Sequence, residues 1–232
     1  DRPARMPFLL APALLLVQAS LVAPRPLTAI EVASAAQRLG FALRVSATAA
    51  LVKVELLDSE KNDVVGETYA FAQPNGMLHW DSIQTRRQSA YYSRRSAAKR
   101  GALEPGSKPM PTFGVFGPSV LLAAAVLAWT REDAPFRCRT AEMLAIADEE
   151  RQNCTLVRLY KIFGFKPDRT VDEGLGSVSD RLFFGGCGVI MQAPVEALSL
   201  TAANLIALAL AGAELAEASS EGSGLDSETP KA

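Results

Sequence analysis

Three short segments in the first half of the chain alternate between apolar and polar residues, and short polar turns separate them. The segments are Val52 to Asp58 (VKVELLD), Val64 to Gln73 (VVGETYAFAQ) and Met77 to Thr85 (MLHWDSIQT). Alternation of this kind is typical of strands with one buried face. Pro74-Asn75-Gly76 separates the second and third segments and is a strong turn signal. Because strands joined by such short turns pair antiparallel, the sequence predicts a three-stranded antiparallel meander.

Downstream of the meander, the pattern predicts a helix, a strand, a second helix and two further strands. Pro118 fits the first turn of the first helix, where its missing N–H group removes little hydrogen bonding. The expected elements are an apolar helix Val120 to Trp129, a strand Arg139 to Ala147, a polar turn Asp148 to Gln152, a helix capped by Asn153, and strands near Arg169–Val171 and Leu182–Gln192. This order predicts an α+β domain built on a mixed sheet.

A basic segment, Arg86 to Pro111, lies between the meander and the apolar helix, and we expect it to form a long loop. It contains seven Lys or Arg residues, one acid, and several Gly and Pro residues. Such a segment can contact CoA phosphates, RNA or an acidic protein partner, or simply form a solvated surface. RNA binding there would depend strongly on salt. The net charge of −1 argues against a nucleic-acid-binding protein as a whole.

An apolar run near the N-terminus, Pro7 to Val22, has the pattern of a signal peptide. Arg2 and Arg5 precede the run, and small residues follow it. The alternative is a single membrane anchor, although the run is short for a membrane span.

The next segment, residues 24–50, contains three arginines but only one acid, Glu31. An arginine-rich, acid-poor stretch resembles an organelle transit peptide, and a signal followed by a transit segment is typical of a plastid protein reached through the secretory route. A mitochondrial location and a membrane-anchored protein are the alternatives. We therefore expect residues 1–50 to be a targeting segment, while the other interpretation is that residues 28–47 form an ordinary helix of the domain.

The C-terminal part divides into a helix and a tail. Pro194 to Glu217 is rich in Ala and Leu, and we expect a packed helix there rather than a membrane span. The final residues, 217–232, are polar and acidic, which predicts disorder. The expected organisation is a targeting segment (1–50), a domain (51–194) with its basic loop (86–111), a C-terminal helix (195–216) and an acidic tail (217–232).

Cysteine and histidine usage limits the chemistry available to the chain. Its 232 residues suit one domain with appendages. The three cysteines, Cys138, Cys154 and Cys187, are too far apart for a CxxC motif, and their odd number argues against a disulfide framework. We therefore expect thiols in a reducing compartment. The single histidine, His79, excludes a site that needs two, and we expect no metal.

The stretch LVRLYKIFGFKP, which begins at Leu156, carries the most informative motif. Its apolar residues Leu156, Leu159, Tyr160 and Phe163 recur at the spacing of one helix face, and a Gly-Phe pair follows. This pattern predicts a helix that presents Tyr160 on its inward face and ends at a glycine.

Read with the preceding strand, the motif Asn153-x-x-Leu156-x-x-Leu159-Tyr160-x-x-x-Gly164-Phe165 resembles the late motif of the GNAT superfamily of N-acetyltransferases. The meander, the glycine-bearing turn into a helix and the strand–helix–Gly-Phe unit follow that superfamily's order. The resemblance covers roughly Val52 to Gln192. The stretches QPNGMLHWDSIQTRR, CRTAEMLAIADEERQ and DRLFFGGCGVIMQ are similar to a poorly characterised group of acetyltransferase-like proteins of photosynthetic organisms.

The resemblance implies a GNAT-like fold that uses acetyl-CoA to acetylate an amine. Tyr160 matches the position of the general acid that protonates the departing thiolate; the alternative is a core tyrosine with a hydrogen-bonded hydroxyl. Asn153 matches the first residue of the motif, which lies near the tail of the cofactor. The alternative is a plain N-cap of the helix, and the two roles are compatible. Ile83 and Gln84 on the third strand are also expected to contact the cofactor.

Family members hold the CoA pyrophosphate in a glycine-rich turn before a helix, where backbone N–H groups face the phosphates. The corresponding turn here contains Gly114, Val115, Phe116, Gly117 and Ser119. It keeps two glycines but lacks the family's leading Gln or Arg and its full spacing, and Pro118 removes one N–H donor. The turn is either a modified phosphate site or a plain helix start.

A candidate for the base lies on the third strand of the meander. Strict alternation places His79, Asp81 and Ile83 on one face, with Trp80, Ser82 and Gln84 on the other. His79 and Asp81 would then form an oriented acid–base pair; the alternative is a structural hydrogen-bonded pair.

Two hypotheses of function follow. The first is an acetyl-CoA-dependent N-acetyltransferase, whose acceptor, a small amine or a protein, cannot be inferred from the fold. The second is a catalytically inactive GNAT-fold subunit that uses the basic loop and the C-terminal helix to bind within a larger plastid assembly, such as a photosynthetic one.

Overall fold

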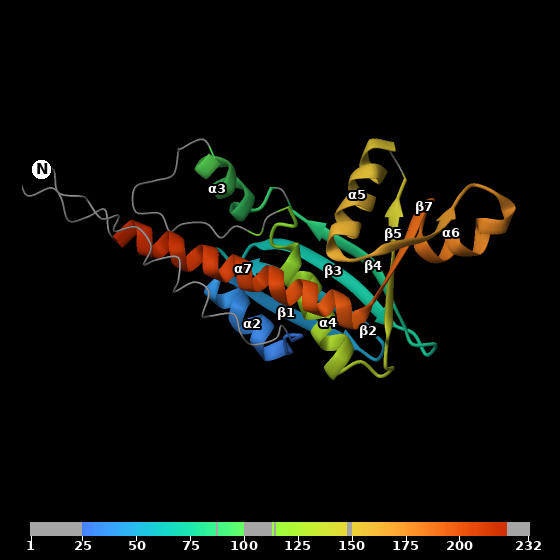
Figure 1. Cartoon of the computed structure of the whole chain (residues 1–232), viewed down its shortest axis with the longest axis horizontal. Coiled ribbons are helices and arrows are strands. Elements are labelled where there is room, and N and C mark those ends of the chain that lie inside the picture. Colours follow the sequence, from blue (N-terminus) through green and yellow to red (C-terminus); the bar gives the residue numbers. More distant parts are fainter. Residues whose placement is uncertain (1–24, 87, 100–112, 114, 148–149, 222–232) are drawn as a thin grey trace, which may run out of the picture.

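The computed structural model describes residues 25–86, 88–99, 113, 115–147 and 150–221. Their central feature is a seven-stranded sheet with the strand order β1-β2-β3-β4-β5-β7-β6 (Figure 1). The strands are β1 (Phe41–Thr48), β2 (Leu51–Asp58), β3 (Val64–Ala72), β4 (Met77–Thr85), β5 (Thr140–Ile146), β6 (Lys166–Val171) and β7 (Gly188–Pro194). The helices are α2 (Ala29–Arg38), α3 (Ala90–Lys99), α4 (Ser119–Glu132), α5 (Glu150–Phe163), α6 (Val178–Phe184) and α7 (Val195–Glu221), with a 3-10 turn, η2, at Leu175–Ser177.

The predicted meander is confirmed, because β2, β3 and β4 pair antiparallel in that order. β4 then pairs parallel with β5, but only over four positions, from Met77 opposite Thr140 to Trp80 opposite Met143. β7 pairs antiparallel with both β5 and β6. The sheet is therefore mixed and the domain is α+β, as expected. The predicted order of meander, turn, helix and strand–helix–Gly-Phe unit is also present.

A β-bulge in β4 changes which side chains share a face. Trp80 lies opposite Ala70 of β3, and Ser82 lies opposite Tyr69, so Asp81 has no partner on β3. Since one extra residue reverses the alternation, Ile83 returns to the face that carries Trp80. The alternation expected from the sequence holds up to Trp80 and is wrong beyond it.

Helices α2, α4 and α7 lie together on one face of the sheet (Figure 1). Every residue of α4 from Val120 to Thr130 is buried. A helix that is apolar all round needs neighbours on all sides, and α4 has them in β2, β3, α2 and α7. The main core therefore lies on this face, where Val52, Val54 and Leu56 of β2 meet α4.

Part of the expected targeting segment is built into the domain. Residues 29–38 form α2, whose N-terminus is closed by a reciprocal capping box between Thr28 and Glu31. Residues 41–48 form β1, which pairs along its whole length with β2. The sheet therefore begins ten residues before the expected start of the domain at residue 51. The alternative interpretation, that residues 28–47 form a helix of the domain, is correct for residues 29–38 and wrong for residues 41–47, which belong to a strand.

Several other boundaries differ from those expected. The helix α7 runs to Glu221, so residues 217–221 are helical where a disordered tail was expected. Residues 90–99 of the expected basic loop form α3, and residues 100–112 lie outside the described part. The turn expected at Asp148–Gln152 is wrong in its second half, because α5 begins at Glu150. The last strand is shorter than expected: Leu182 to Phe184 belong to α6, which ends at Gly185 in the left-handed conformation.

The C-terminal helix α7 packs against α4, α2 and α5. Its segment Val195–Ala216 is also the one described helix that is long and apolar enough to cross a membrane, and a third of that segment is buried in the domain. The packing agrees with the expected packed helix.

Candidate functional site

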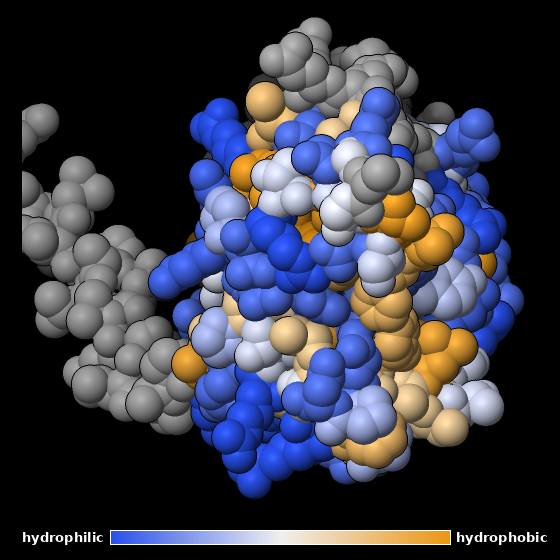
Figure 2. Space-filling view, turned by 90° about the vertical axis from the view of Figure 1, so that its right-hand side faces the viewer, coloured by the Kyte–Doolittle hydropathy of each residue, from blue (hydrophilic) through white to orange (hydrophobic). Residues whose placement is uncertain are grey.

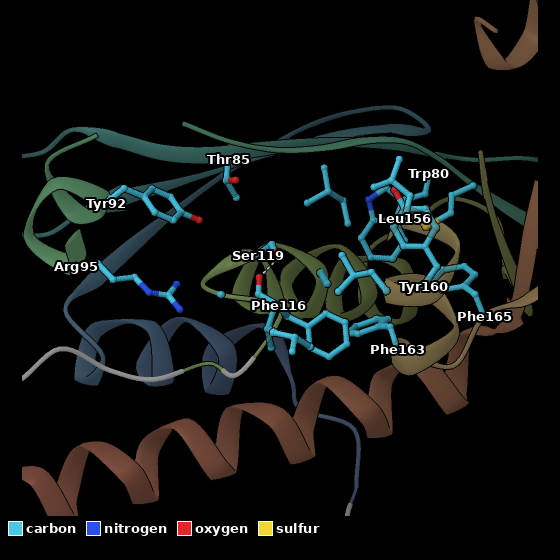
Figure 3. Close-up of a pocket in the computed structure, with 17 residues that line it drawn as sticks. Trp80, Thr85, Tyr92, Arg95, Phe116, Ser119, Leu156, Tyr160, Phe163 and Phe165 are labelled. Atoms are coloured by element: carbon cyan, nitrogen blue, oxygen red, sulfur yellow. Dashed lines mark hydrogen bonds between the residues drawn. The ribbon is translucent and has the colours of Figure 1, made fainter. Parts of the chain in front are cut away.

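A cavity of about 420 Å³ lies where the parallel pairing of β4 and β5 stops (Figure 3). Its walls come from β4, β5, α3, α4, α5 and the turn before α4. It is lined by Trp80, Ile83, Thr85, Tyr92, Arg95, Val115, Phe116, Gly117, Ser119, Val120, Ala123, Met143, Leu156, Leu159, Tyr160, Phe163 and Phe165. The bulge at Asp81 brings Trp80, Ile83 and Thr85 to the same wall.

One end of the cavity is aromatic. Trp80 is buried, and its indole Nε1 donates a hydrogen bond to Thr68 Oγ1 at 2.8 Å. Phe163 of α5 packs edge-on against Phe116 with ring centroids 5.4 Å apart. Tyr160 lies between these groups, as expected for a residue on the inward face of α5 (Figure 3).

The Gly-Phe pair of the motif is a helix C-cap that fixes Tyr160. The N–H of Phe165 donates to Tyr160 O at 2.9 Å, and the N–H of Gly164 donates to Lys161 O at 3.1 Å. These two bonds form a Schellman motif, which needs a positive φ at the glycine; Gly164 has φ of +115°. The rings of Phe165 and Tyr160 then come within 6.1 Å. The cap thus holds the phenol at this end of the cavity.

Burial raises the pKa of Tyr160 to about 12. Desolvation disfavours the phenolate because its charge would lie in a poorly solvated environment. The phenol therefore keeps its proton at neutral pH and can donate it to an anion that forms beside it.

The other end of the cavity is polar and cationic. Tyr92 and Arg95 of α3 point toward the first turn of α4, which carries Ser119 (Figure 3). A Cβ added at Gly117 would lie 3.6 Å from both Arg95 Nη1 and Tyr92 Oη. The first N–H groups of a helix lack acceptors within the helix, so α4 adds its own positive end to that of Arg95.

The expected phosphate turn is only partly present in this cavity. Gly117, Phe116, Val115 and Ser119 line it, and Gly117 has a positive φ of +59°. Ser119 Oγ donates to Phe116 O at 2.5 Å, which closes the turn on itself. Gly114 lies outside the described residues.

Asn153 does not cap α5, because the helix begins three residues earlier at Glu150. Its side-chain amide instead donates to Ala145 O at 2.7 Å and to Ile146 O at 3.2 Å. Asn153 therefore ties α5 to the end of β5, outside the cavity lining. The expected N-cap is wrong, and the residue positions the helix that carries Tyr160.

The expected pair of His79 and Asp81 does not form. Asp81 is exposed at the bulge, whereas His79 is buried on the opposite face of the sheet from the cavity. His79 Nδ1 lies 3.5 Å from Glu142 Oε1, and the ring of Phe71 is 4.7 Å away. Of the two strand residues expected at the cofactor, Ile83 lines the cavity, and Gln84 is exposed opposite Glu67.

Sequence reasoning missed Tyr92, Arg95 and Thr85 in the cavity and Glu142 beside His79. Tyr92 and Arg95 are three residues apart, which is a helical spacing. That spacing was a usable signal, but it was hidden within a segment that its glycines and prolines marked as a loop. Within the described residues, no group of three His, Cys, Asp or Glu side chains comes together to hold a metal.

No protein-family model and no curated protein matches the sequence. Among solved structures, the chain is similar to a Desulfovibrio desulfuricans protein assigned to the GNAT family of acetyltransferases, with 18% identity, coverage of 63% of this chain and 69% of the other, and a TM-score of 0.36. It is also similar to Ard1 from Thermoplasma volcanium, with 14% identity, coverage of 77% and 85%, and a TM-score of 0.32. Both similarities are at low identity and with TM-scores below 0.5, and neither assigns a residue of this cavity.

Proposed function

We propose that this domain binds acetyl-CoA in the cavity between β4 and α5 and transfers its acetyl group to an amine. The observation that carries this proposal is the polarity of the cavity: a cationic end at Arg95 and a protonated phenol, Tyr160, at the aromatic end. A ligand that suits both ends has an anionic part, an uncharged arm and a reactive group that releases an anion. A CoA thioester has all three.

The cationic end supports binding of phosphate groups. The guanidinium of Arg95 can bind two phosphate oxygens at once, and the start of α4 provides backbone donors. At Gly117 the lack of a side chain leaves the backbone open toward Arg95 Nη1 and Tyr92 Oη. In this proposal Arg95 binds the phosphate groups in place of the leading Gln or Arg that the turn lacks.

The aromatic end supports the chemical step. Acetyl-CoA supplies an activated carbonyl, which the amine nitrogen attacks, so a C–N bond forms while the C–S bond breaks. The sulfur leaves with the bonding electron pair and takes the phenolic proton of Tyr160, and the proton that the nitrogen loses restores the phenol through solvent. Trp80, Phe116 and Phe163 exclude water around Tyr160, which strengthens this proton transfer.

Titration calorimetry with acetyl-CoA tests the binding. We expect Arg95→Gln to weaken affinity by about tenfold or more, the usual loss for a charged hydrogen bond. Arg44→Gln, on edge strand β1 and bridged to Glu55, is the matched control and should bind as the unaltered protein does. If the unaltered protein binds no acetyl-CoA, the proposal is wrong.

Release of free CoA thiol during amine acetylation tests the chemical step. We expect Tyr160→Phe to lower kcat by about 10²-fold or more while acetyl-CoA affinity is kept. Tyr69→Phe, on the other face of the sheet, should retain activity. Equal kcat in both variants would remove Tyr160 from the mechanism.

The second candidate is a GNAT-fold subunit that binds a larger assembly without catalysis. It is favoured by α7, on which Leu208 is 71% exposed and Leu215 57% exposed. Large apolar side chains at the surface are typical of contacts with another protein. Co-purification with a complex, together with acetyl-CoA binding but no turnover on any amine, would favour this candidate.

A plastid location remains a prediction from the N-terminal composition. Cleavage near residue 50 would remove both α2 and β1 from the domain. We therefore place the proposed targeting segment before Thr28. Imaging of residues 1–27 fused to a fluorescent protein tests this placement, and a fusion that stays in the cytosol would contradict it.

A further inference from the structure

The two edges of the seven-stranded sheet differ in how well they are protected from pairing with another strand. β1 forms one edge and β6 forms the other. An edge strand has backbone N–H and C=O groups without a partner in the sheet, so proteins usually protect such an edge with prolines, bulges and charged side chains. An edge that lacks these features is open to a further strand.

β6 carries all three protective features. It reads KPDRTV, in which Lys166, Asp168 and Arg169 are charged and Pro167 has no N–H group. Its register with β7 shifts between Pro167 and Arg169, which interrupts the regular edge. Figure 2 faces the end of the molecule that carries β6 and shows hydrophilic residues over much of it. β6 is therefore unsuited to pairing with a further strand.

β1 lacks these features. It reads FALRVSAT, has no proline, and pairs with β2 in one unbroken register from Phe41 to Thr48. Its one charged residue, Arg44, is bridged to Glu55 of β2. Val45 is 49% exposed, although it lies opposite the buried Val54 on the face of the sheet that meets α4. Within the described residues, no strand pairs with the outer side of β1.

The pairing of β1 with β2 shows which backbone groups of β1 point outward. In an antiparallel pair, every second residue directs its N–H and C=O groups to the neighbouring strand, and the residues between direct theirs away from it. Gly40 O, one position before β1, accepts a hydrogen bond from Ser59 N at 3.1 Å. The even-numbered residues of β1 therefore bond to β2, and the groups of Leu43, Val45 and Ala47 point outward.

This outward edge is complementary to a second copy of itself. A two-fold axis at Val45 sets Val45 opposite Val45 of the second copy and Leu43 opposite Ala47 of the second copy, so that outward groups meet outward groups. On the other face of the sheet, Arg44 then lies opposite Ser46 of the second copy. No two like charges lie directly opposite each other, and the contact covers the exposed side of Val45.

We propose that β1 pairs antiparallel with β1 of a second copy of this chain, which gives a two-fold dimer with one continuous sheet. Because β6 is protected, the pairing closes at two copies instead of extending into a fibre. The inference goes beyond the proposed function and does not depend on it, since no residue of β1 lines the cavity.

Size-exclusion chromatography with light scattering, over a range of protein concentrations, tests the dimer. We expect a dimer that dissociates on dilution and no larger species. Val45→Lys sets two like charges opposite each other at the two-fold axis, so it should raise the dimer dissociation constant by about tenfold or more. Leu208→Lys is the matched control, because Leu208 is an exposed apolar residue on α7; it should leave that constant unchanged.

Hydrogen exchange of the unaltered protein tests the register and needs no variant. The amides of Leu43, Val45 and Ala47 should be protected in the dimer and should exchange rapidly after dilution to the monomer. A protein that stays monomeric, larger assemblies in place of a dimer, or a dimer that Leu208→Lys dissociates and Val45→Lys does not, would overturn the inference. Protection of the three amides in a monomer would also overturn it, since a segment of the same chain would then cover β1. None of these results bears on acetyl-CoA binding, which calorimetry tests separately.

Discussion

The substitution Gly164→Ala tests whether the C-cap at Gly164 ends the helix of the LYKIFGF stretch in the way that the structure shows. Gly164 has φ of +115°, a conformation that side chains with a Cβ rarely adopt. A Cβ placed there would lie 3.7 Å from Leu198 Cδ2 and 3.8 Å from Thr201 Oγ1, which is ordinary contact. The substitution therefore adds backbone strain without a steric clash.

The strain sets the size of the effect. A Cβ in a left-handed conformation costs about 1–2 kcal/mol, and alanine lowers the entropy of the unfolded chain, which offsets part of that cost. We expect the free energy of unfolding to fall by about 1 kcal/mol. Gly176→Ala is the matched control, because Gly176 lacks a positive φ and a Cβ there meets no atom within 4 Å.

Urea denaturation followed by circular dichroism measures both variants against the unaltered protein. Gly176→Ala should be neutral or slightly more stable, and Gly164→Ala should unfold at a lower urea concentration with an unchanged slope. If the two variants have the same free energy of unfolding, Gly164 does not adopt a positive φ in solution. The Schellman cap would then not position Tyr160, and this part of the reasoning would be refuted.

Three further predictions concern the bulge, the phenol and the N-terminal elements. Deleting Asp81 should remove the extra residue of the bulge while Trp80 stays opposite Ala70 and Ile83 stays opposite Thr68 on the cavity wall, so both this deletion and Asp81→Ala should keep acetyl-CoA binding by calorimetry, and loss of binding in the deletion alone would contradict this account of the bulge. The pKa of Tyr160 in the folded protein, about 12, exceeds its ordinary value of 10. The contribution of this group to the free energy of unfolding is therefore fully present below pH 10 and is lost as the pH rises through 12. Denaturation at alkaline pH should show this loss in the unaltered protein and not in Tyr160→Phe. Removing residues 25–39 should expose the core beneath α2 and abolish cooperative unfolding, whereas removing residues 1–24 should preserve it.

Period-two patterns were sufficient to predict β2, β3 and β4, because each strand has one buried face. Composition was misleading where it was used in place of pattern. The arginine content of residues 24–50 favours a targeting segment, whereas the Thr28–Glu31 capping box signals the start of a helix, the alternative interpretation of residues 28–47. The glycines and prolines of residues 86–111 likewise favour a loop, and this composition conceals α3 and with it Tyr92 and Arg95.

Within the site, the sequence motif is enough to predict that Tyr160 lies on the inward face of its helix, because helix periodicity and a terminating glycine are local properties of the sequence. The sequence does not predict the partner of His79, because Glu142 is 63 residues away along the chain and meets His79 only through the register of β4 and β5. The bulge at Asp81 depends in the same way on pairing with β3, and no local pattern signals it.

The bulge also explains how one strand serves two faces of the sheet. Before it, β4 is in register with β5, and successive residues His79 and Trp80 point to opposite faces. After it, Ile83 and Thr85 line the same wall as Trp80, beyond the point where β5 stops pairing. The extra residue therefore extends the cavity wall toward Arg95 while His79 stays beside Glu142.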